Sequence, residues 1–282
     1  MQVGLIGIGS KGATTVHLAA DTVRDDELFA VTALKSSPAP RATVEAADQC
    51  QFISDDHIEN DEKLNQAIKQ VVLVAIANTD FAALVVDSSR EWARVAGRIA
   101  IHLLDLSSAF GGTMHTALYL IGENDRMSDK SEQFNAELGM LSDSECYIDR
   151  GMDFEAVGQR LGLFYGAAWY SDKARRDIEW VAQPEGFVLG HTSPDMSSGV
   201  FKSRINGEFD NALEEAVYHD LTAEVGAGSG RRTLVVLRVP HRVVIDKRRV
   251  KRAVDKIIDT DARIVFIRNE AFDDIDIIVA RG

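Results

Sequence analysis

The chain has 282 residues, 45% of them hydrophobic, and a formal net charge of −13 at pH 7. This size suits one large or two modest domains. No apolar run reaches the roughly 18 residues of a membrane span, and the N-terminus enters a strand pattern without a signal peptide. The acidic balance argues against nucleic acid as a partner, because phosphates would be repelled. We therefore expect a cytoplasmic protein.

The choice of charged residues is also informative. The chain contains 27 Asp against 17 Glu, and 21 Arg against only 10 Lys. Abundant Asp with scarce Lys favours hydration at multimolar salt, where the Debye length falls to about 3 Å or less. This composition indicates a halophilic source. The two cysteines and seven histidines show no metal-ligand spacing, so we expect no metal site.

In chain order, the first half alternates between strand and helix patterns, which is typical of a parallel α/β sheet. A loop is expected over most of 35–60, and DKSEQFNAELGML predicts a single helix over 129–141. The predicted strands are 2–6, 28–34, 71–77, 99–105 and 117–121, and the predicted helices are 12–23, 61–69 and 81–96.

The second half has more strands and fewer intervening helices, which favours an α+β domain. A Gly-, Ser- and Pro-rich stretch at 184–208 predicts a long surface loop. The predicted strands are 162–170, 232–238, 262–267 and 274–280, and the predicted helices are 209–224 and 246–258. The resulting division is an α/β domain at 1–125, a connecting helical segment at 126–144 and an α+β domain at 145–282.

The N-terminal segment MQVGLIGIGSKGATTVH contains a glycine turn between a strand and a helix, formed by Gly7, Gly9 and Gly12. Such glycines let the backbone approach a phosphate, and the helix N-terminus attracts negative charge. Ser10 could donate a hydrogen bond to the phosphate and Lys11 could neutralise it. The alternative is that the glycines only pack the helix tightly against the strand.

Five segments carry a resemblance to a known family. They are GIGSKG (7–12), YLIGENDRM (119–127), MDFEAVGQRLGLFYGAAWYSD (152–172), ALEEAVYHDLTAEVGAGSGRRTLVVLRVP (212–240) and IIDTDARIVFIRNEAFDDIDIIVA (257–280). In this order they resemble the tubulin/FtsZ superfamily, in particular its noncanonical archaeal FtsZ/CetZ-like members. The resemblance implies that 1–125 is a reduced, Rossmann-like nucleotide-binding domain, joined by a central helix at 126–144 to a smaller α+β domain, with GTP or GDP as ligand.

Departures from the family pattern concern the phosphate loops. The family's GGGTGTG-like loop should follow the strand predicted at 71–77, but the chain reads ANTDFAA at 77–83. Asp80 would there direct a negative charge at a phosphate, which is unfavourable. The family's other glycine-rich loop, expected within 36–60, contains no glycine. The resemblance therefore implies a degenerate nucleotide site.

The family resemblance also suggests catalytic and base-binding residues. In family filaments, two acidic residues of one subunit enter the nucleotide site of the next; here the first aligns with Asp153, and Glu155 lies beside the second, displaced position. Asn124 aligns with the residue that recognises the guanine base. The alternatives are helix-capping roles for Asp153 and Asn124. The implied enzyme is a very weak GTPase or none.

The resemblance predicts a cytoskeletal protein of cell division or cell shape, which assembles with itself or modulates a canonical FtsZ/tubulin homologue. The alternative is an NADP-dependent oxidoreductase, because a glycine turn directly after a first strand is also a dinucleotide fingerprint. In that case Lys35 and Arg41, which follow the second strand, suit the 2′-phosphate of NADP. The basic run at 246–256 indicates either a solvated helix face or a site for an acidic partner or a second copy.

Overall fold

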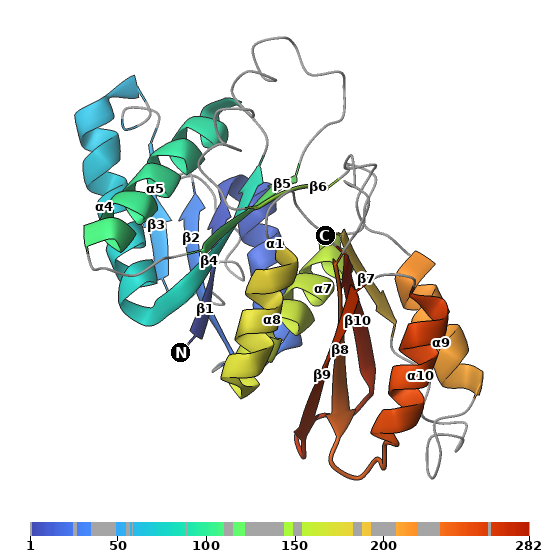
Figure 1. Cartoon of the computed structure of the whole chain (residues 1–282). Coiled ribbons are helices and arrows are strands. Elements are labelled where there is room, and N and C mark those ends of the chain that lie inside the picture. Colours follow the sequence, from blue (N-terminus) through green and yellow to red (C-terminus); the bar gives the residue numbers. More distant parts are fainter. Residues whose placement is uncertain are drawn as a thin grey trace.

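The computed structural model describes residues 2–24, 27–34, 49–54, 57, 59–87, 90–109, 115–121, 144–148, 154–182, 188–192, 207–218, 232–258 and 261–281. Two sheets and their helices form five layers in these residues (Figure 1). The layers alternate between helices and sheets, and each sheet is covered by helices on both faces.

The first sheet has six parallel strands in the order β3-β2-β1-β4-β5-β6. The chain order reverses direction between β1 and β4, and parallel α/β sheets bind ligands at the carboxyl ends of the strands that flank such a switch point. The six strands are β1 (Gln2–Ile8), β2 (Leu28–Leu34), β3 (Gln49–Phe52), β4 (Thr79–Asp87), β5 (His115–Ile121) and β6 (Ser144–Ile148).

Alternating side chains of β1 enter different cores, as expected for a strand that is buried on both faces. Val3 and Leu5 face the core that contains helices α1 (Gly9–Thr22) and α7 (Phe154–Gly166). Ile6 and Ile8 face the opposite core, under α4 (Asp61–Asn78) and α5 (Arg90–Ala109). The sheet thus fixes the start of α1 at its carboxyl edge.

The second sheet has four strands in the order β7-β10-β8-β9, with β8 and β9 parallel and β10 antiparallel to both β7 and β8. One face packs against α7, the 3-10 helix η1 (Ala167–Tyr170) and α8 (Asp172–Ala182). The other face is covered by α9 (Gly207–Tyr218) and α10 (Lys247–Ile257). The strands are β7 (Val188–Thr192), β8 (Arg232–Pro240), β9 (Asp261–Asn269) and β10 (Asp276–Arg281).

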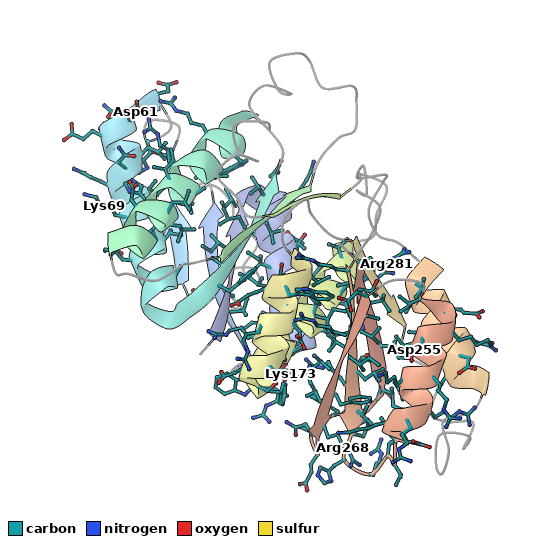
Figure 2. The ribbon with its side chains drawn as sticks, viewed as in Figure 1. Asp61, Lys69, Lys173, Asp255, Arg268 and Arg281 are labelled. Carbon is teal, nitrogen blue, oxygen red and sulfur yellow. The ribbon has the colours of Figure 1, made fainter. Side chains whose placement is uncertain are left out.

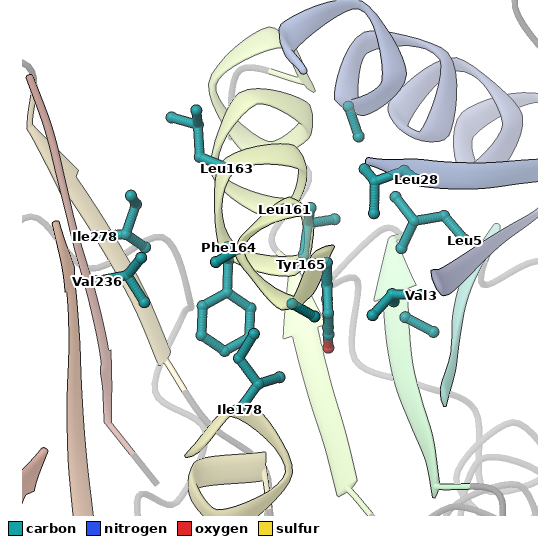
Figure 3. Packing of buried hydrophobic residues seen from close by; sticks show 14 of the residues in the cluster. Val3, Leu5, Leu28, Leu161, Leu163, Phe164, Tyr165, Ile178, Val236 and Ile278 are labelled. Atoms are coloured by element: carbon teal, nitrogen blue, oxygen red, sulfur yellow. The ribbon is translucent and has the colours of Figure 1, made fainter. Parts of the chain in front are cut away.

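Helix α7 lies between the two sheets and supplies the largest side chains of their common core (Figure 3). Phe164 and Tyr165 are fully buried, with ring centroids 4.9 Å apart. Val236 of β8 and Ile278 of β10 belong to the same core as Leu5 of β1. One continuous apolar core therefore joins both sheets.

Glycines spaced four residues apart bring α7 close to α1. A Cβ on Gly158 would lie 2.6 Å from the Cβ of Leu18, and a Cβ on Gly162 would lie 2.4 Å from the carbonyl oxygen of Ala19. A Cβ on Gly166 would lie 3.1 Å from Val23 Cγ1. The contacts advance together along both helices, so α7 runs in the same direction as α1.

A buried polar cluster also joins the two halves. The guanidinium of Arg238 on β8 donates to both carboxylate oxygens of Glu27, over 2.9 and 3.2 Å, and the two residues are 3% and 0% exposed. The hydroxyl of Tyr170 donates to Glu27 over 2.5 Å and accepts from Asn269. Burial, followed by the hydrogen bond to the Glu27 carboxylate, raises the pKa of Tyr170 above its ordinary value.

Most predicted elements are confirmed, as is the α/β class. Strands form over the predicted ranges 2–6, 28–34, 117–121, 232–238 and 262–267, and over most of 274–280. Helices form over most of 12–23 and 246–258, and over all of 61–69. The predicted helix at 209–224 is confirmed to Tyr218, whereas the helix predicted at 129–141 lies outside the described residues.

Between residues 71 and 105, two predicted strands are wrong and the helix predicted at 81–96 is only partly right, because its residues 90–96 lie in α5. The apolar run 71–77, predicted as a strand, is the second half of α4, a helix whose N-cap Asn60 accepts from two backbone N–H groups. The segment 81–87, predicted as helix, is most of β4, and the strand predicted at 99–105 lies within α5. Short apolar runs look alike in buried helices and buried strands, so periodicity alone misassigned them.

Further corrections concern the second half and the loops. The strand predicted at 162–170 is the end of α7 followed by η1. The loop predicted at 184–208 contains β7, and the loop at 35–60 contains β3. Strand β6 pairs with β5 although it follows the proposed boundary at residue 125, so the first sheet draws on both sides of that boundary. Among the described helices, none combines the length and apolar character needed to cross a membrane.

Candidate functional site

The glycine turn lies at the switch point between β1 and β4. β1 ends at Ile8 and α1 begins at Gly9, whose φ of 77° favours glycine. The N-cap Ile8 provides no side-chain hydrogen bond to the first turn. The amides of that turn and the positive end of the helix are therefore features that can attract an anion.

Packing alone accounts for Gly7 and Gly12. A Cβ on Gly12 would lie 2.1 Å from the carbonyl oxygen of Val85 on β4. A Cβ on Gly7 would lie 2.8 Å from the Cα of Ala13 in α1. Both contacts involve backbone atoms, which cannot move aside as a flexible side chain can. These two glycines are thus required for α1 to pack on the sheet, whether or not a ligand binds.

The flank of Gly9 is filled by side chains from the neighbouring strand and helix. A Cβ on Gly9 would lie 2.7 Å from both the Cβ of Asp87 and the Cδ1 of Trp92. Asp87 ends β4 and is 8% exposed, and Trp92 lies in α5 and is 6% exposed. An acid beside a helix N-terminus interacts favourably with it, and the same carboxylate would repel a phosphate.

The outer side of the turn is more open. Ser10 is exposed and Lys11 is half-buried. Their backbone carbonyls accept hydrogen bonds from Thr14 Oγ1 at 2.8 Å and Thr15 Oγ1 at 3.0 Å. These two residues and the first-turn amides suit one phosphate group. Asp87 and Trp92 occupy the other side of the turn, beside Gly9. The described residues therefore do not fit a site in which two glycine-rich loops enclose a triphosphate.

The expected position of the second phosphate loop is corrected. Residues 77–83 are the end of α4 and the start of β4, and the register pairs Thr79 with Gln2 and Phe81 with Val3. Asp80 thus lies at the amino edge of the sheet, roughly 20 Å along β4 from Asp87 at 3.3 Å per residue. The segment that follows β4, 88–89, lies outside the described residues.

One of the two predicted catalytic acids lies in α7. Glu155 is exposed in the first turn of that helix, whereas Asp153 and Asn124 lie outside the described residues. Because α7 runs parallel to α1, its first turn lies at the same edge of the first sheet as the glycine turn.

Sequence reasoning missed Asp87 and Trp92. The available signal was the acid that directly follows the apolar residues of FAALVV (81–86), since a polar residue at the carboxyl end of a buried strand points to a site edge. The wrong assignment of 81–87 to a helix concealed it. Trp92 gave no signal, because its place beside Gly9 depends on how α5 packs.

Solved structures of the tubulin/FtsZ superfamily match the whole chain, and the chain therefore has the fold of these structures. No protein-family model and no curated protein sequence matches it.

Three of these structures come from archaea. CetZ1 from Haloferax volcanii, a GDP-bound monomer, gives a TM-score of 0.70 at 13% identity and covers 100% of this chain and 94% of its own. CetZ from Methanosaeta thermophila gives 0.69 at 11%, with coverages of 99% and 86%. CetZ2 from Haloferax volcanii, a GTPgS-bound protofilament, gives 0.64 at 15%, with coverages of 100% and 93%. None of these neighbours supports the NADP alternative.

Proposed function

We propose that this protein assembles with itself, or modulates the assembly of a canonical FtsZ/tubulin homologue, in cell division or cell shape. The observation that carries the proposal is the match of the whole fold to superfamily members, one of which is a protofilament. A cytoplasmic protein of a halophilic archaeon is the setting that the composition and these neighbours support. Nucleic acid is not a proposed partner.

We propose further that GTP hydrolysis is weak or absent. The support is the flank of Gly9, where Asp87 and Trp92 take space beside the first turn of α1. A guanine nucleotide would be held by the first turn, with Ser10 and Lys11 at a phosphate and Asn124 at the base. Bound GTP would supply the phosphoanhydride bond. The chain would bind and orient the nucleotide only from the side of the first turn of α1.

We propose that Asp153, with Glu155 beside the second acidic position, meets the glycine turn of a neighbouring subunit in a longitudinal contact. We therefore expect Asp153→Arg to abolish assembly in light scattering, with Asp105→Arg on exposed α5 as the matched control. Unchanged assembly in the Asp153→Arg variant would overturn this contact.

Calorimetric titration of GTP, GDP and then NADPH in multimolar KCl tests the ligand. We expect guanine nucleotide to bind weakly, and Asp87→Asn to strengthen binding by about tenfold, because one nearby charge repulsion is removed. Ser10→Ala serves as a control that keeps the charge. Binding of NADPH alone would overturn the proposal in favour of an oxidoreductase, and a monomer under all conditions would overturn assembly.

A further inference from the structure

The outer layer of the second sheet consists of two helices of opposite charge. Helix α9 contains four acidic residues and no basic one, whereas α10 contains six basic residues and one acidic residue. The two helices contact each other and lie side by side (Figure 1). In a chain with a net charge of −13, a helix this basic is an exception that needs a reason.

The apolar faces of both helices are committed to the core. Phe209 and Leu213 of α9, and Val250 and Val254 of α10, are buried against β8 and β10. The charged faces therefore point away from the sheet, as Figure 2 shows for Asp255 on α10. Among the described side chains of the two helices, the exposed ones are Asn211, Glu214 and Glu215 on α9, and Lys247, Arg248, Lys251, Arg252, Asp255 and Lys256 on α10.

The strand topology sets the two helices parallel. Helix α9 connects β7 to β8, and α10 connects β8 to β9. β7 and β8 are each antiparallel to β10, so they are parallel to each other, and β8 is parallel to β9. Both helices thus return along the sheet in the same direction. The exposed acids Glu214 and Glu215 of α9 consequently lie in the same outer layer as the exposed basic residues of α10.

We propose that this face pairs with the same face of a second copy about a two-fold axis that runs between the helices and parallel to them. This axis places each α10 over the partner's α9, so that opposite charges meet twice. A two-fold axis in the same plane but perpendicular to the helices would bring like charges together. Isologous pairing requires such a self-complementary surface, and complementary charge fixes the orientation.

The size of the face makes the pair weak. Helices of 12 and 11 residues are each about 17 Å long, and two of them cover less than the roughly 800 Å² per partner of a standard interface. Such contacts become effective when copies are already held together, because the local concentration is high. This pairing involves neither the glycine turn nor a nucleotide. It would be a second contact between copies of an assembling protein.

Charge reversal on each helix tests the pairing. Lys251→Glu/Arg252→Glu lowers the net charge of α10 from +5 to +1 and places two acids opposite the partner's acidic α9. Glu214→Lys/Glu215→Lys raises the net charge of α9 from −4 to 0 and places two basic residues opposite the partner's basic α10. We expect each variant alone to associate at least about tenfold more weakly than the unaltered chain, because like charges then meet. An equimolar mixture of the two should recover association as a heterodimer. Sedimentation velocity at about 0.1–1 mM suits a weak interface of this class, and circular dichroism checks the folding.

The matched control is Lys69→Glu/Arg176→Glu, which changes the net charge equally at exposed positions on α4 and α8. This control should dimerise like the unaltered chain and should gain nothing from the basic variant. If it paired as well as the α10 variant does, net charge alone would explain the result and the proposal would fail. A mixture that stays monomeric would also overturn it, as would α10-dependent binding to anionic lipid vesicles without self-association.

Discussion

Besides the common apolar core, two contacts between the halves of this molecule differ in kind. The contact between α1 and α7 is steric: glycines at 158 and 162 let two backbones approach. The contact between Glu27 and Arg238 is polar, and both of its side chains are buried. The first contact tolerates no added atom, whereas the second depends on each charge keeping its partner. Close backbone packing thus holds the halves together at α1 and α7, and a buried ion pair holds them together at Glu27 and Arg238.

The largest expected effect comes from breaking the polar contact on one side. Arg238→Met leaves the Glu27 carboxylate buried without its main partner, which costs about 3–5 kcal/mol. Urea unfolding at neutral pH measures the loss. In the double variant Glu27→Met/Arg238→Met no charge remains uncompensated, so part of the stability should return. A double variant less stable than Arg238→Met would contradict this account.

The steric contact is tested by Gly162→Ala. The added Cβ would lie 2.4 Å from the carbonyl oxygen of Ala19, so the helices must separate. We expect a loss of about 1–3 kcal/mol in the free energy of unfolding. Gly97→Ala in α5, at a half-exposed helical position, is the control and should gain up to about 1 kcal/mol from helix propensity. Equal effects of the two substitutions would refute close packing as the cause.

A pH dependence distinguishes the polar contact from the steric one. The pKa of Tyr170 is raised by burial and by the Glu27 carboxylate. A raised folded-state pKa gives stability that is present below the unfolded value, near 10, and is lost as the pH rises further. Unfolding free energies measured from pH 8 to 11 should therefore fall above pH 10. The slope should diminish in Tyr170→Phe and persist in Gly162→Ala.

The smallest effect is expected at an exposed ion pair, which sharpens the contrast with the buried one. Asp61 accepts from Arg94 at 2.6 Å and from Arg98 at 3.0 Å, and the hydrogen bond from Arg94 is the main cause that lowers the pKa of Asp61. Its contribution is present above the unfolded value of 3.8 and is lost as the pH falls. Arg94→Ala should alter unfolding only slightly, and only above about pH 4. A loss like that of Arg238→Met would contradict the distinction.

The close approach of α7 shows where sequence reasoning stopped short. The segment FEAVGQRLGLFYG has glycines at 158, 162 and 166, a four-residue spacing that matches a helix ridge and not a strand. The prediction of a strand at 162–170 gave weight to apolar and aromatic content instead. The spacing could have indicated the helix, but only the structure shows that the ridge packs on α1.

By itself, the sequence determined the elements whose local pattern is compatible with a single kind of secondary structure. The basic helix predicted at 246–258 and the strands at 232–238 and 262–267 were recognisable because their local patterns match their local structures. The glycine turn after β1 was recognisable for the same reason, since its chemistry lies within a few consecutive residues.

The tertiary structure decided how those elements pack and which distant residues they bring together. VVLVAIA at 71–77 is a helix and not a strand because α4 continues from its cap at Asn60 and packs beside α5, which no short apolar run can specify. Asp87 and Trp92 reach Gly9 from about 80 residues away along the chain. A local pattern can place a turn at a sheet edge, but the side chains that close its flank come from other strands and helices, and only packing brings them there.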